Sequence, residues 1–183
     1  MRGLVPRFSH AAWSAPASRP DVVTFIRTAD SGRAAALLPL KYARMCASPF
    51  GFLRGAAALM AHDLSTTPST GWRVQVCGDA HLANFGAFAT PEREVVFDAN
   101  DFDETTRGPW EWDLKRLGTS VVLVGRQNRL SAAACTDAAL ALTRSYRLAM
   151  HGYAAAGYLA TERDHAVFVA GTKDDTRDWP THC

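Results

Sequence analysis

The 183-residue sequence lacks several features that would assign it to a specialised class of protein. It has no run of about 18 apolar residues, the length that a helix needs to cross a bilayer. Arg2 and Arg7 are not followed by an apolar segment, so we expect no signal peptide. The formal net charge is only +2. These absences predict a protein that has neither a membrane nor a nucleic acid as its partner.

Cysteine is sparse as well. The four cysteines are scattered and form no Cys-x-x-Cys pair, which argues against a zinc knuckle and against a disulfide framework. Reduced thiols are typical of the cytoplasm, where we therefore expect the protein. Cys46 and Cys135 fall on apolar helix faces, so we interpret both as small buried hydrophobic residues.

The composition that remains is that of an ordinary globular protein, with 48% hydrophobic and 21% charged residues. The length suits one domain. Breaks in polarity divide the chain into an extended lead-in at residues 1–20, a domain at residues 21–155, and a tail at residues 156–183. The tail is rich in charge, Thr and Asp, and we expect it to be poorly ordered.

Helical patterns occupy the first half of the domain. Asp21 is typical of a helix cap, and apolar residues recur at helical spacing from there to about Leu64. Ser48 and Pro49 predict the start of one helix that carries Phe50 and continues to Leu64.

Strand patterns follow at residues 72–77, 85–88 and 94–98, and the last two are joined as a hairpin. Helical spacing returns from Trp112 to Asn128, and Ser131 caps an Ala-rich helix that reaches about Tyr153. We therefore predict an α+β fold, with N-terminal helices packed on a small antiparallel, hairpin-bearing sheet and two further helices after it.

The stretch from Val74 to Thr105 combines apolar strand residues with many carboxylates. The hairpin would return Asp98, Asp101 and Asp103 to the loop that contains Asp79. Carboxylates at such short distances repel one another unless a cation lies between them. We expect Mg²⁺, because this ion typically binds one or two carboxylates together with phosphate oxygens.

The spacing within this stretch matches the phosphotransfer template, in which an Asp accepts the proton of a hydroxyl and an Asn five residues later holds a metal. Asp79 and Asn84 have that offset, and Asp101-Phe102-Asp103 supplies the Asp-Phe-acidic triplet after the hairpin. We interpret Asp79 as the base and Asn84 and Asp101 as metal ligands. Asp98 competes with Asp101, and Asp103 is a further candidate.

"GDAHLAN" followed by "NDFDE" resembles the catalytic core of the aminoglycoside phosphotransferase and choline kinase group. The resemblance implies the larger lobe of a protein-kinase-like fold, Mg²⁺, ATP as co-substrate, and a small acceptor with a hydroxyl group. It also implies that Asp113 in "WEWDLKRL", together with Gly78, supports the catalytic loop. Cys77 stands where the group has His, so the contribution of that imidazole to the hydrogen bonding of the loop is either absent or supplied by His81, which we take as a second catalytic candidate.

Longer motifs extend this resemblance. "RMCASPFGFLRGAAALMAHDL", "CGDAHLANFG", "PEREVVFDANDFDET" and "GPWEWDLKRL" are similar to a bacterial family catalogued as domain of unknown function twenty-two fifty-two. The similarity runs from about Arg7 to Tyr153 and does not include the tail. It implies a fold and a reaction class and leaves the substrate open.

One absence bears on activity. No glycine-rich phosphate loop and no strand lysine precede the catalytic loop. The resemblance implies that longer members of the family carry both after this region, so we expect a truncated chain that is inactive alone and whose partner is the missing C-terminal half.

The basic residues near these motifs have structural as well as functional interpretations. Arg54 in "FLRGA" could bind a phosphate or carboxylate through its guanidinium, or form a structural salt bridge. Lys115 and Arg116 are most simply a solvated helix face.

Three classes of function therefore stand. The first is the Mg²⁺-dependent phosphotransferase. The second is a metal-dependent hydrolase in which His81 and the carboxylates hold an ion that activates water. The third is a kinase-like remnant without catalysis.

Overall fold

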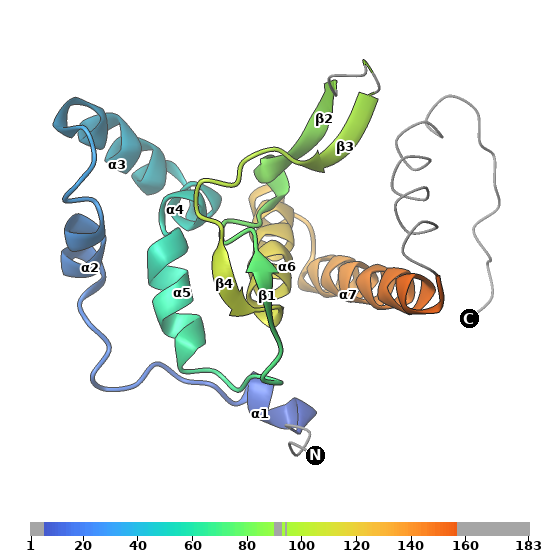
Figure 1. Ribbon diagram of the computed structural model, residues 1–183. Coiled ribbons are helices and arrows are strands. Elements are labelled where there is room, and N and C mark those ends of the chain that lie inside the picture. The colour runs from blue at the N-terminus through green and yellow to red at the C-terminus, as the bar shows by residue number, and fades with distance from the viewer. Residues whose placement is uncertain (1–5, 90–92, 94, 157–183) are drawn as a thin grey trace.

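The computed structural model describes residues 6–89, 93 and 95–156, and it has an α+β architecture (Figure 1). The expected tail lies almost wholly outside the described residues. The helices are α1 (Arg7–Ala11), α2 (Val22–Ala29), α3 (Leu38–Ala47), α4 (Pro49–Gly55), α5 (Ala57–Ser65), α6 (Glu111–Gln127) and α7 (Ala132–Ala155). The strands are β1 (Arg73–Val76), β2 (Phe85–Ala89), β3 (Val95–Ala99) and β4 (Thr106–Pro109). None of the helices in the described part is long and apolar enough to span a membrane.

Helix starts agree with the capping residues in the sequence. Asp21, Ser48 and Ser131 each accept a hydrogen bond from the backbone N–H three residues later, which satisfies a donor that has no partner inside the helix. Pro49 follows Ser48 as the first residue of α4, where its missing N–H costs nothing. These three predicted helix starts are confirmed.

Two helical predictions are wrong. The lead-in, expected to be extended, contains the short helix α1. The helix expected from Pro49 to Leu64 is two helices, because the backbone of Ala56 (φ −117°, ψ 33°) leaves the helical region between α4 and α5. Ala56 is buried at this corner, and α5 then packs against α2. Burial in the core thus overrides the continuous helical pattern of the sequence.

The strands form two separate antiparallel ribbons where the sequence predicted one small sheet. The predicted hairpin is present, with Phe85 opposite Ala99 in β2 and β3. The other ribbon pairs β1 with β4, and β4 was missed. The sequence of β4, Thr-Arg-Gly-Pro, contains Gly and Pro, two residues that usually end strands. The strand forms because its backbone pairs with the edge of β1.

The hydrophobic core lies between α2, α3 and α5. It consists of Ile26, Met45, Ala56 and Leu59. α6 packs against α4 and α5, and α7 packs against α6. At the α6–α7 contact a Cβ on Gly125 would lie 2.8 Å from Sγ of Cys135, so the two helices approach closely there. Cys135 is buried as predicted, whereas Cys46 is exposed, so the prediction for Cys46 is wrong.

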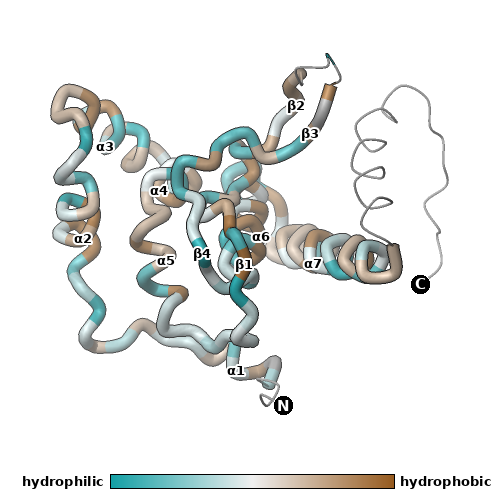
Figure 2. Tube along the Cα trace, viewed as in Figure 1, coloured by the Kyte–Doolittle hydropathy of each residue, from teal (hydrophilic) through white to brown (hydrophobic). Residues whose placement is uncertain are grey.

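Among the exposed apolar side chains are those of the β2–β3 hairpin and of α7. Phe88, Val95 and Phe97 of the β2–β3 hairpin are 40–57% exposed, and the hairpin projects away from the helices (Figures 1 and 2). α7 carries Leu140 and Leu148, which are also more than half exposed. The hydrophobic core between α2, α3 and α5, and the loop described next, lie elsewhere.

Candidate functional site

The candidate site is built around the loop that joins β1 to β2. Gly78 begins this loop with a positive φ of 82°, a conformation that other residues rarely adopt. A Cβ at this position would lie 2.1 Å from the carbonyl oxygen of Glu104, so only glycine lets the loop approach the segment that follows β3. The glycine therefore brings two acidic segments of the sequence together.

α6 fixes the backbone of the loop. The carboxylate of Asp113 accepts hydrogen bonds from the N–H groups of Cys77 (2.7 Å) and Gly78 (3.0 Å). Two turns further along the helix, the hydroxyl of Ser120 accepts a bond from the N–H of Leu82 (3.1 Å). These contacts satisfy loop donors that no strand can reach, so α6 acts as the rigid support of the loop.

Arg116 completes this face of α6. It is 2% exposed, and its Nε donates to Oδ1 of Asp79 at 2.8 Å. Its Nη2 donates to the same oxygen and, at 2.7 Å, to the carbonyl of Leu53 in α4. The interpretation of Arg116 as a solvated residue is therefore wrong. The same interpretation is only partly right for Lys115, because this side chain is partly buried and donates a hydrogen bond to the hydroxyl of Thr67.

A signal for Arg116 was present in the sequence. Residues three and four apart lie on the same helix face, and Asp113, Arg116 and Ser120 have these spacings. Once Asp113 was expected to contact the loop, Arg116 should have been expected to face the same loop.

Asp79 is mostly buried, and its ionisation reflects opposing effects. Burial alone would raise the pKa of its carboxyl group, but hydrogen bonds from His81 and Arg116 and the charge of Arg116 outweigh burial and hold this pKa below its ordinary value. Arg116 occupies Oδ1, whereas the contact of Oδ2 with Nε2 of His81 is long, at 3.5 Å. Asp79 is thus a fixed carboxylate with Oδ2 available for another donor.

His81 lies beside this carboxylate and is only 4% exposed. Its ring meets the ring of Phe50 edge-on at 5.9 Å. Its Nδ1 is buried and has no hydrogen-bond partner in the described part of the chain. Such an atom costs free energy unless a ligand or water satisfies it.

Asn84 connects the two acidic segments. Its side chain is buried, and its Nδ2 donates to the carbonyl oxygens of Asp79 (3.3 Å) and Asp101 (3.1 Å). Because the amide nitrogen is used in this way, the Oδ1 of Asn84 is the atom that remains for a ligand. Cys77 lies at the same junction, where burial raises the pKa of its thiol and so keeps it neutral.

The other acidic candidates differ in position. Asp101 and Asp103 are exposed and line the same cavity as Asp79, and the Oδ1 of Asp101 accepts the N–H of Asp103 at 3.1 Å. Asp98 sits inside β3 opposite Gly86, and its carboxylate accepts the N–H of Ala99. Asp98 is not among the residues that line this cavity.

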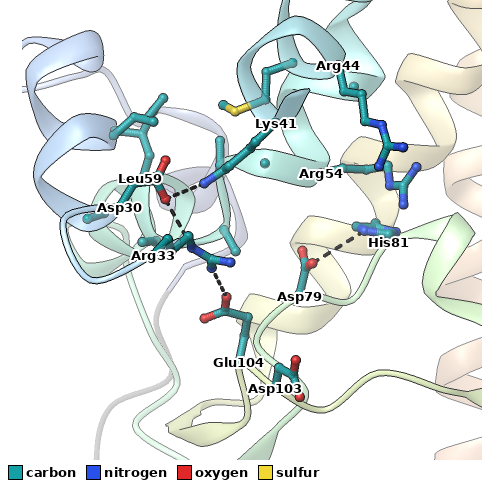
Figure 3. Close-up of a pocket in the computed structure, with 18 of the residues that line it drawn as sticks. Asp30, Arg33, Lys41, Arg44, Arg54, Leu59, Asp79, His81, Asp103 and Glu104 are labelled. Carbon is teal, nitrogen blue, oxygen red and sulfur yellow. Dashed lines mark hydrogen bonds and ion pairs between the residues drawn. The ribbon is translucent and has the colours of Figure 1, made fainter. Parts of the chain in front are cut away.

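The cavity has a volume of about 1220 Å³ and opens between α3, α4 and the loop. Its charged lining is drawn in Figure 3. On one side Asp30, which is 2% exposed, pairs with Lys41 and Arg33, and Arg33 continues to Glu104 at 3.1 Å. This chain of ion pairs ties α2 and α3 to the segment that follows β3, and it neutralises that side of the cavity.

The donor set bears on the predicted Mg²⁺. The described residues contain no cluster of three or more His, Cys, Asp or Glu side chains that would form a metal cage of their own. A carboxylate from Asp101 and an amide oxygen from Asn84 do line one cavity. Two such oxygens suit Mg²⁺, which usually completes its shell with water and substrate phosphates.

Comparison with known protein families identifies the wider group. A family model described as "uncharacterized protein conserved in bacteria (DUF2252)" matches residues 33–180, which include every candidate site residue. The chain belongs to this family. In this DUF2252 protein the match also covers residues 157–180, which we expected to diverge from the family. No curated protein and no solved structure matches the chain.

Proposed function

We propose that this DUF2252 protein contributes the hydroxyl-activating and metal-binding half of a Mg²⁺-dependent phosphotransferase site. The observation that carries the proposal is the role of Asn84, whose single side chain bonds the loop of Asp79 and the turn of Asp101. These groups are 22 positions apart in the sequence and line one cavity. A base and a metal ligand must lie this close when a phosphate is transferred to a hydroxyl.

Asp79 is the proposed base. Because its pKa is lowered, its carboxylate is ionised at neutral pH and orients the acceptor hydroxyl through Oδ2. It takes the proton as the hydroxyl oxygen forms its bond to phosphorus and the bond between phosphorus and the donor's leaving oxygen breaks. Arg116 keeps the carboxylate in place, and His81 sits against Oδ2.

Asn84 and Asp101 are the proposed Mg²⁺ ligands. Bound there, the ion would neutralise charge on the transferring phosphate. We prefer Asp101 to Asp98 because Asp101 shares the cavity with Asp79, and Asp103 is held close by its turn with Asp101. ATP is the proposed phosphate donor.

The hydrolase alternative has less support. It needs His81 and several carboxylates around one ion, whereas Nε2 of His81 faces Asp79 and the described residues hold no such cluster. The phosphotransferase needs only two protein ligands, because the nucleotide supplies the others.

The test is metal binding in the presence of nucleotide. Mn²⁺ can replace Mg²⁺ as a paramagnetic probe, and its binding to the full chain with ATP is followed by electron paramagnetic resonance. We expect Asp101→Asn to weaken the ternary complex by about 10-fold or more, in line with the loss of a metal-supporting group. Asp98→Asn, which changes the same charge three residues away, is the matched control and should bind as the unmodified chain does.

Two results would refute the proposal. If Mn²⁺ and ATP together bind at millimolar concentration neither to this chain nor to a longer member of the family, the phosphotransferase assignment fails. If Asp98→Asn abolishes binding and Asp101→Asn does not, the metal lies at the hairpin and the assignment of Asp101 is wrong.

A further inference from the structure

We propose that Arg44 and Arg54, with His81 beneath them, form a subsite for an oxyanion, and that the acceptor of the proposed reaction carries a phosphate or carboxylate group. The subsite stands on geometry alone. Only its assignment to the acceptor rests on the proposed function.

The first observation is that the two arginines have no partners among the described residues. Arg44 lies in the last turn of α3 and Arg54 in the last turn of α4, and both line the cavity. Within the described part of the chain, neither side chain has a hydrogen bond or an ion pair. Two guanidinium groups on one cavity wall repel each other, and an anion between them would remove that repulsion.

The second observation is the close packing that holds them there. A Cβ on Gly51 would lie 2.3 Å from the carbonyl oxygen of Arg44, and a Cβ on Gly55 would lie 2.4 Å from Cγ of Met45. The two glycines lie one turn apart in α4, so their bare face lets α4 press against the end of α3. This approach brings the turns that carry Arg44 and Arg54 to one wall of the cavity.

The third observation is His81. Its ring lines the same cavity, and Figure 3 draws it on the same side as both guanidinium groups. It is 4% exposed, with a buried Nδ1 that lacks a partner among the described residues. The guanidinium N–H groups of both arginines are donors suited to an oxyanion, and the Nδ1 of His81 is a buried polar atom beside them that a ligand or water would satisfy.

The distribution of charge gives the ligand its class. Lys41 and Arg33 are neutralised by Asp30 and Glu104, and Asp79 is neutralised by Arg116. The described cavity charges without ion pairs are Arg44, Arg54, Asp101 and Asp103, and Figure 3 draws Asp103 on the far side of Asp79 from the two arginines. A ligand whose anionic group binds Arg44 and Arg54 and whose hydroxyl group reaches Asp79 would match this distribution of charge.

The test uses the full chain without metal, and inorganic phosphate as the probe. Arginine Nε–Hε signals in a ¹⁵N-correlated spectrum report on each guanidinium, and each Arg→Gln variant identifies its signal by removing it. We expect phosphate to shift the signals of Arg44 and Arg54 with saturation. Arg44→Gln or Arg54→Gln should weaken phosphate binding about tenfold, as loss of a charge-assisted hydrogen bond does.

Two further variants sharpen the readout. Arg126→Gln removes the same charge from an exposed position in the last turn of α6 and should leave phosphate binding unchanged. Arg54→Lys keeps the charge but loses the forked donor geometry, so we expect it to bind more weakly than the unmodified chain and more tightly than Arg54→Gln. A shift of equal size at Arg44, Arg54 and Arg126, or unchanged binding in the double variant Arg44→Gln/Arg54→Gln, would overturn the subsite.

A competition experiment distinguishes the two sources of the anion. If Mg²⁺ and ATP bind while phosphate still occupies the arginines, the subsite belongs to the acceptor, as proposed. If ATP displaces phosphate and shifts the same signals, the arginines hold the nucleotide and the acceptor assignment is wrong. If phosphate binds at the arginines and Mg²⁺ with ATP binds neither to this chain nor to a longer member of the family, the phosphotransferase proposal and the acceptor assignment both fail, while the subsite stands.

Discussion

Two kinds of arginine surround the loop that carries Asp79. Arg116 is 2% exposed and bonds Asp79, the carbonyl of Leu53 and the sulfur of Met60, so its position is set by the fold. Arg44 and Arg54 are exposed and line the cavity, without a partner among the described residues. The same side chain therefore serves as a structural brace in one place and as an open binding group in the other.

The difference lies in what happens when each arginine is removed. A buried carboxylate that loses its cation keeps the cost of its desolvation, whereas an exposed guanidinium is hydrated and its removal leaves nothing unsatisfied. Substitution of Arg116 should therefore act on stability, and substitution of Arg44 or Arg54 should act on binding.

The largest expected effect is that of Arg116→Met. It leaves Asp79 and the carbonyl of Leu53 without their donor, and we expect the free energy of unfolding to fall by about 3–5 kcal/mol. Arg44→Met, the matched control at an exposed position, should change it by no more than about 0.5 kcal/mol. Urea denaturation measures both, and an equal loss in the two variants would contradict the distinction between the two kinds of arginine.

Asp113→Ala tests the same brace from the other side of the loop. It removes the acceptor for the N–H groups of Cys77 and Gly78, so we expect a loss of about 2–3 kcal/mol and fast hydrogen exchange at these two amides. Asp137→Ala, on the exposed face of α7, is the control. Protection of the two amides that survives in Asp113→Ala would show that the strand and not α6 holds the loop.

Gly51→Ala tests the wall that carries the open arginines. The added methyl group would clash with the carbonyl of Arg44. This overpacking should outweigh the better helix propensity of alanine, so we expect the free energy of unfolding to fall by about 1–2 kcal/mol. Phosphate binding should weaken as α3 and α4 separate. Gly152→Ala, where a Cβ meets nothing within 4 Å, should instead raise stability by up to about 1 kcal/mol. A neutral Gly51→Ala variant would mean that the contact is not tight.

The smallest effect is in the acid dependence of stability. The pKa of Asp79 is lower in the folded chain than its ordinary value of 3.8, so its contribution is full above about pH 4 and is lost as the pH falls through the folded pKa. Asp79→Asn lacks this contribution. Urea denaturation at pH 7 and pH 3 should show a smaller loss on acidification in Asp79→Asn than in the unmodified chain, and an equal loss would mean that Arg116 does not favour the charged form.

Sequence patterns predicted local features well. The caps at Asp21, Ser48 and Ser131, the β2–β3 hairpin and the two final helices follow from short-range rules, because each depends on residues within a few positions. The loop from Gly78 to Asn84 was found from the spacing of its polar residues. Asp113 was expected at the loop because its distance from Asp101 matched a known catalytic pattern.

Features set by distant contacts were missed. The strand β4 exists through pairing with β1, the corner at Ala56 exists because both sides of it are buried, and the burial of Arg116 depends on the position of Asp79 and Leu53. Arg44 was not singled out, because its closeness to Arg54 depends on how two glycines pack against another helix.

The sequence by itself determined where helices and strands start and which polar residues gather on one loop, since capping, turn chemistry and hydrophobic periodicity act over a few residues. Only the tertiary structure decided which charges are neutralised. An ion pair depends on the three-dimensional distance between groups that are tens of positions apart, so the division of the arginines into a buried brace and an open pair could not be read from the chain alone.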